Sequence, residues 1–147
     1  MRTMSLFERD LLRRLIQDFA RMLAAIVGMR QRGELDDAES ELASYVNALL
    51  GQLAKDAEQL DSETLGKLLK VERLRHYALL IAERANLRAA RGAHSEALED
   101  RSRALELLLE ARAKSGDTSD AQLIRELASE ISLAGLAPRY RDLLSAG

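Results

Sequence analysis

Apolar residues recur every three or four positions along most of the chain, which is the spacing of amphipathic α-helices. The pattern predicts helices over about residues 6–31, 35–53, 62–70, 71–91, 95–113 and 120–134. Pro138 can open a last short helix. The pattern leaves open whether 62–70 and 71–91 are two helices or one bent helix. We expect a single all-α domain over residues 1–147, with about six helices and two αα-hairpins.

Glycines and capping residues mark the ends of these helices. Gly33 and Gly92 each follow a long helical pattern, and glycine accepts the left-handed conformation that closes a helix. Because the turns are short, the helices on either side are expected to pack antiparallel. Asp61 is predicted to cap the third helix, and Ser119 with Gln122 fits a capping box for the sixth.

The second hairpin, "RGAHSEALEDRSRALEL", resembles the tetratricopeptide repeat. The resemblance rests on Gly92, Ala97 and the pair Ala104–Leu105, because a small residue after the turn lets two helices approach closely. Arg101 departs from the aromatic residue of that family. The two hairpin glycines are 59 residues apart (92 − 33), whereas these repeats recur at about 34 residues. Repeat ancestry and convergent hairpin packing both stay open.

A broader resemblance covers most of the chain. The segments "RGELDDA", "LDSETLGKLL" and "ERANLRAARGAHSEAL", in this order after a long first helix, are similar to a family of uncharacterised bacterial helical proteins. That family is regarded as tetratricopeptide-like and has no established activity. The resemblance therefore implies a fold and carries over no catalytic residue.

Composition narrows the class of protein. The 147 residues carry a net charge of −2, which argues against a nucleic-acid-binding domain. The sequence has no cysteine, so disulfides and thiolate chemistry are excluded. The apolar run at residues 22–29 is too short for a membrane span, and no clear signal peptide precedes it. We expect a cytoplasmic protein without an integral membrane segment.

Candidate chemistry is sparse. His76 lies four residues after Glu72 on one helix face, but a di-iron bundle needs the spacing Glu-x-x-His twice. His94 is expected in a turn. The sequence shows no serine or threonine beside a base and no glycine-rich phosphate loop. We therefore expect no metal, no cofactor and no enzymatic activity.

A basic stripe is the first candidate for binding. The resemblance implies that the first helix of each hairpin lines a concave surface, where arginines clamp the carboxylates of an acidic peptide. The candidate residues are Arg73, Tyr77, Arg84, Arg88 and Arg91. The alternative is that these arginines pair with acidic residues of the fifth helix or face solvent.

The first helix offers a second candidate, because its apolar arc is wider than one partner helix covers. The leftover surface predicts a homodimer seam at Leu12, Ile16, Leu23 and Val27. The alternative is that this helix lies at the centre of the bundle. Interfacial membrane binding, with Arg9 and Arg13 above an apolar face, is a further use.

These expectations point to a non-catalytic adaptor or scaffold that binds an unidentified protein or peptide. A helical bundle that encloses a small apolar ligand, as a sensor or carrier, is the alternative. An internal cavity favours the carrier, whereas a grooved surface over a packed core favours the adaptor.

Overall fold

The computed structural model describes residues 5–147, and the regular structure of this range consists of helices alone. The α-helices are α1 (Leu6–Gln31), α2 (Leu35–Leu50), α3 (Ser62–Leu68), α4 (Val71–Ala90), α5 (His94–Ser115), α6 (Ala121–Glu130) and α7 (Pro138–Ala146). Short 3₁₀ turns are η1 (Gly51–Lys55), η2 (Ala57–Gln59) and η3 (Leu133–Gly135). The all-α class is confirmed. The described range holds seven α-helices rather than about six, because α7 is a complete helix beyond η3.

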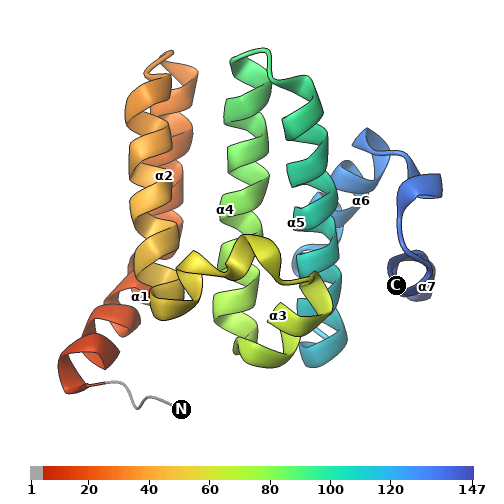
Figure 1. Ribbon diagram of the computed structural model, residues 1–147, viewed down its shortest axis with the longest axis horizontal. Helices are drawn as coiled ribbons and strands as arrows, with labels where there is room; N and C mark the ends of the chain where they lie inside the picture. The colour runs from red at the N-terminus through yellow and green to blue at the C-terminus, as the bar shows by residue number, and fades with distance from the viewer. Residues whose placement is uncertain (1–4) are drawn as a thin grey trace.

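Two antiparallel hairpins, α1–α2 and α4–α5, form the body of the structure (Figure 1). They meet along α4, which contacts both α1 and α2. The chain between the hairpins crosses one end of α4 through η1, η2 and α3, and α3 packs against α5. The last two helices, α6 and α7, both pack against α5. No helix within residues 5–147 has the length and apolar content that a membrane span requires.

The two hairpin turns have the same geometry. Gly33 (φ +78°) and Gly92 (φ +83°) both take the left-handed conformation, as predicted. In both turns the N–H after the glycine donates to the carbonyl five residues earlier, at 2.9 and 2.8 Å. These are the bonds of a Schellman motif, which satisfies the last carbonyls of a helix. The similar residues around Gly33 and Gly92 therefore reflect the same turn geometry.

Capping and extended residues set the helix boundaries in the connector between the two hairpins. The Asp61 carboxylate accepts the Thr64 N–H at 2.7 Å, so the predicted cap of α3 is confirmed. Leu69 and Lys70 have extended backbones, with ψ of 142° and 154°, which makes α3 and α4 two separate helices. The second helix stops at Leu50, earlier than predicted, because the chain changes direction at Gly51 (φ +59°).

The capping box predicted for the sixth helix is wrong. α6 begins after Asp120, and the Ser119 N–H donates to the Asp117 carboxylate at 2.9 Å, within the preceding loop. α6 also ends at Glu130, four residues before the predicted end, because Ile131 is extended. Local turn chemistry around Asp117 thus decides where the helix begins.

The core is a continuous apolar cluster with members from α1 to α7. Between α4 and α5 it contains four alanines with no exposed surface, which let the two helices approach closely: Ala78, Ala85, Ala97 and Ala104. Leucines fill most of the remaining volume, in agreement with the low aromatic content. Three carboxylates are buried in the same region, those of Glu83, Asp100 and Glu110, and each one accepts hydrogen bonds from an arginine.

Candidate functional site

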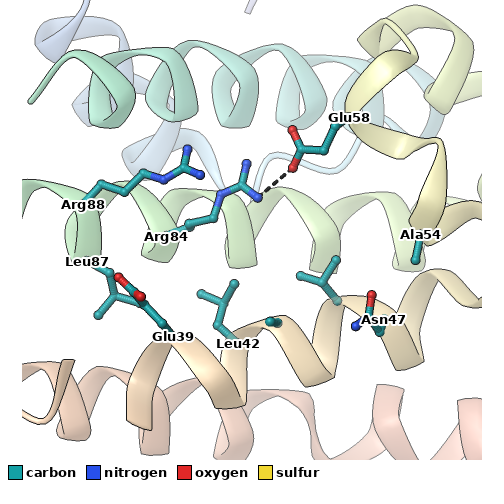
Figure 2. Close-up of a pocket in the computed structure, with 10 residues that line it drawn as sticks. Glu39, Leu42, Asn47, Ala54, Glu58, Arg84, Leu87 and Arg88 are labelled. Carbon is teal, nitrogen blue, oxygen red and sulfur yellow. Dashed lines mark hydrogen bonds and ion pairs between the residues drawn. The ribbon is translucent and has the colours of Figure 1, made fainter. Parts of the chain in front are cut away.

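A groove lies between α2 and α4 (Figure 2). Its volume is about 430 Å³, and the connector closes it at one end. The apolar lining consists of Leu42, Ala43, Val46, Ala54 and Leu87. The polar lining consists of Glu39, Asn47, Glu58, Arg84 and Arg88. The groove exists because small and medium side chains on the facing sides of α2 and α4 do not fill the space between the two hairpins.

Arg84 and Arg88 stand on one face of α4, since they are four residues apart in a helix. Both donate to Asp100 of α5. Arg84 forms two bonds, Nε to Oδ2 at 3.1 Å and Nη2 to Oδ1 at 2.9 Å, and Arg88 Nη1 reaches Oδ2 at 2.9 Å. The Asp100 side chain is only 3% exposed. A buried carboxylate thus fixes the guanidinium groups that stand along one wall of the groove.

The third hydrogen bond of Arg84 goes to an exposed partner. Its Nη1 donates to Glu58 Oε1 at 2.7 Å, and the Glu58 side chain is 56% exposed (Figure 2). Burial alone would lower the pKa of Arg84, but the hydrogen bonds that Arg84 donates to Asp100 and Glu58 outweigh it and raise that pKa. Burial likewise opposes ionisation of Glu58, and the bond from Arg84 outweighs it, so the pKa of Glu58 is lowered. Both groups are charged at neutral pH.

The other members of the predicted basic stripe lie elsewhere. Arg91 pairs with Asp36 and Glu39 of α2, so it joins the two hairpins at their turns. Arg73 donates to the Leu49 carbonyl at the end of α2, through Nε at 3.0 Å and Nη2 at 2.7 Å. Burial lowers the pKa of Arg73.

Tyr77 is buried in the core, away from the surface around which the stripe was predicted. Of the five predicted residues, only Arg84 and Arg88 line the groove. The fifth helix provides their partners, as the alternative interpretation described.

Sequence reasoning missed the carboxylates that organise the groove. Asp100 follows Ala97 by three positions and precedes Ala104 by four, so it lies on the inner face of α5. The position of Asp100 between these alanines could have indicated a buried ion pair, since a charged residue on an inner face needs a partner. No comparable signal existed for Glu58, which reaches Arg84 through the path of the connector.

The predicted seam on α1 is partly covered. All four residues are half-buried, and Leu12 and Leu23 pack against the core. The most exposed large apolar side chains of α1 lie nearer its N-terminal end, at Leu6, Phe7 and Leu11.

His76 is a buried aromatic partner. Its ring stacks on that of Phe19, with centroids 3.9 Å apart and planes 2° from parallel, and its Nδ1 has no hydrogen-bond partner. Glu72, one helical turn earlier, is exposed. His94 is the exposed first residue of α5. Among residues 5–147, no three His, Asp or Glu side chains converge to hold a metal.

This environment predicts a pH-dependent contribution to stability. Burial, and then the charge of Arg75, lower the pKa of His76 below 6.5, against the weaker opposing charges of Glu72 and Asp120. Because the folded-state pKa is the lower one, the unfolded chain binds more protons in this window. The free energy of unfolding is therefore expected to fall as the pH drops from 6.5 toward the folded-state pKa.

Urea unfolding at several pH values measures this effect. His76→Phe, which keeps an aromatic ring against Phe19, is expected to flatten the slope between pH 7 and pH 5, and the control His94→Gln is expected to leave it unchanged. Equal slopes for the wild type and His76→Phe would contradict the assignment.

Comparisons with known protein families, with curated proteins and with solved structures give no match.

Proposed function

We propose that the protein is a non-catalytic, tetratricopeptide-like adaptor, and that the α2–α4 groove binds an acidic, amphipathic segment of a partner protein. The observation that carries the proposal is the hydrogen bond that Arg84 donates to the Glu58 carboxylate. An exposed carboxylate from the connector already occupies the position where the acidic side chain of a ligand would bind. The paired hairpins with identical glycine turns support the tetratricopeptide-like part.

The groove can exchange this internal carboxylate for an external one. The Arg84 side chain is only 20% exposed but that of Glu58 is 56% exposed, so a ligand carboxylate can replace Glu58 without leaving Arg84 unpaired. Arg88 adds donor capacity, because its Nε lies 3.6 Å from the nearest Glu96 oxygen, too long for a hydrogen bond. Asp100 holds both guanidinium groups in place before a ligand arrives, which reduces the entropy lost on binding.

The apolar lining supplies the second half of the recognition. Exposed Ala43 and half-buried Val46 of α2, with half-buried Ala54 of the connector, form the accessible apolar surface beside the arginines, over the buried Leu42 and Leu87. A helical or extended segment with an apolar side chain next to an Asp or Glu matches both features. A more enclosed hollow, between α4, α5 and α6, has only about 20 Å³. That volume holds about one water molecule, so this hollow does not favour the carrier.

Selection from a phage-displayed peptide library tests the proposal. The selected peptides are expected to be rich in Asp and Glu beside Leu, Ile or Val. Ala43 is exposed in the groove, and Ala43→Arg is expected to weaken binding at least about tenfold by filling it. Arg88→Ala is expected to cost about tenfold through a lost charge-assisted bond.

Glu58→Gln distinguishes peptide binding in the α2–α4 groove from peptide binding at another surface. Removing the internal competitor is expected to tighten peptide binding about two- to fivefold. The matched control is Arg125→Ala, at an exposed arginine of α6. Peptides rich in Lys and Arg, or binding that is insensitive to Ala43→Arg, would refute the groove as the docking site.

A further inference from the structure

The first turns of α1 project beyond the hairpin to which this helix belongs (Figure 1). α1 has 26 residues and its antiparallel partner α2 has 16. At 1.5 Å per residue, α1 is about 15 Å longer than α2, so its first turns lie past the end of α2. The helix is formed to its first turn, since Ser5 Oγ accepts the Glu8 N–H at 3.1 Å. We call residues 6–15 the α1 arm.

The α1 arm carries the two most exposed large apolar side chains of residues 5–147, Leu6 and Phe7. Leu6 is 79% exposed, Phe7 is 78% exposed and Leu11 is 44% exposed. Phe7, Leu11 and Leu15 are spaced by four residues, so they form one row along the helix. At the base of the arm, Leu11 and Leu12 line a groove of about 330 Å³ with Ala48 and Leu49 of α2. Polar residues, among them Asn47, Gln52 and Arg73, complete the lining of this groove, and within residues 5–147 Phe7 and Leu11 of the row stay exposed beside it.

We propose that the protein forms a homodimer in which the α1 arm packs antiparallel against the α1 arm of a second copy. A two-fold axis near Leu11 sets Leu11 against Leu11 and Phe7 against Leu15, so one self-complementary row is covered in both copies at once. This surface lies apart from the α2–α4 groove, and the proposal does not depend on the proposed function. It moves the self-association surface from the middle of α1 to the arm.

Charge complementarity favours a second copy as the occupant. Asp10 and Arg14 lie on the same flank of the apolar row, one turn apart. In an antiparallel pair the same flanks of the two helices meet, so Asp10 of each copy comes within reach of Arg14 of the other. In a parallel pair opposite flanks of the two helices meet, so Asp10 would not face Arg14 of the other copy.

An anionic membrane is the competing occupant. Over residues 6–18 three carboxylates, Glu8, Asp10 and Asp18, are interspersed with three arginines, Arg9, Arg13 and Arg14. An interfacial helix that binds anionic lipid carries an excess of Lys and Arg on its polar face. The balanced charge of this segment fits pairing with itself better than attraction to a lipid surface.

Sedimentation velocity of the full chain, from micromolar to submillimolar concentration, tests the proposal. The wild type is expected to show a concentration-dependent dimer. Phe7→Glu is expected to raise the dimer Kd at least about tenfold, because it removes one buried aromatic side chain per copy and adds a charge. The control Leu133→Glu changes an exposed apolar residue of η3 and is expected to have no effect.

A charge exchange tests the antiparallel geometry. Asp10→Arg and Arg14→Asp are each expected to weaken the dimer, and the double variant is expected to restore it. A monomeric wild type at all concentrations, or a dimer unchanged by Phe7→Glu, would overturn the proposal. Co-sedimentation with vesicles of phosphatidylserine and phosphatidylcholine is the second arm of the experiment. Vesicle binding that Phe7→Glu abolishes, with a monomeric wild type, would assign the α1 arm to membranes instead.

Discussion

Asp100→Ala is expected to lower the free energy of unfolding by about 3 kcal/mol, because it leaves two buried or half-buried guanidinium groups without their shared carboxylate. Asp100 accepts three hydrogen bonds, two from Arg84 and one from Arg88, and lies between α4 and α5. Removing one side of a buried ion pair costs more than the pair itself contributes, since the remaining charge stays desolvated. Urea unfolding followed by far-ultraviolet circular dichroism measures the loss.

Glu96→Ala is the matched control for Asp100. Glu96 belongs to the same helix and faces the same arginine, but its side chain is mostly exposed and lies 3.6 Å from Arg88. We expect its removal to cost less than about 0.5 kcal/mol. Similar losses for Asp100→Ala and Glu96→Ala would show that Asp100 does not hold the arginines of the groove. Peptide binding measured on the same variants then separates positioning of Arg84 and Arg88 from stability.

Glu110→Ala is expected to release α7 from the body of the protein, at a cost of about 3 kcal/mol. Glu110 is 4% exposed. It accepts two bonds from Arg139, both at 2.8 Å, and the Tyr140 hydroxyl donates to it at 2.8 Å. Burial alone would raise the pKa of Glu110, but the bonds from Arg139 and Tyr140 outweigh it and lower that pKa. The substitution leaves the buried Tyr140 hydroxyl without this acceptor.

Limited trypsin digestion detects the release of α7. Cleavage after Arg139 or Arg141 is expected to accelerate in Glu110→Ala, whereas cleavage within α4 and α5 is expected to follow the global loss of stability. Glu63→Ala provides the comparison, since Glu63 lies 3.8 Å from Arg139 and is half-exposed. Unchanged digestion after Arg139 in Glu110→Ala would show that α7 is held by its apolar contacts alone.

The helices themselves followed from local sequence. The spacing of apolar residues predicted α1, α4 and α5 to within about two residues, because a helix buries one face and each face has a fixed period. Gly33, Gly92 and Asp61 marked turns and a cap through backbone conformations that depend on few neighbours. The predictions that were wrong lie at the ends of α2 and α6, where local hydrogen bonds and one glycine compete with the apolar pattern.

Only part of the candidate site could be predicted from the spacing of residues. The four-residue spacing of Arg84 and Arg88 showed that they share a face, and the structure places both in the groove. Spacing within one helix gives no information about a partner on another element. The stripe was therefore predicted to include Tyr77, which the packing of α4 against its neighbours buries completely.

The sequence by itself determined that this chain forms helices, where most of them begin, and which two pairs fold back as hairpins, because these properties depend on residues a few positions apart. Only the tertiary structure decided which carboxylate meets which arginine, that a groove remains between α2 and α4, and that the α1 arm projects past its partner. These features depend on contacts between residues 12 to 55 positions apart in the sequence, as in the pairs Arg88–Asp100 and Arg91–Asp36. Contacts between residues so far apart in the sequence depend on the packing of the whole core, and they leave no periodic pattern in the sequence.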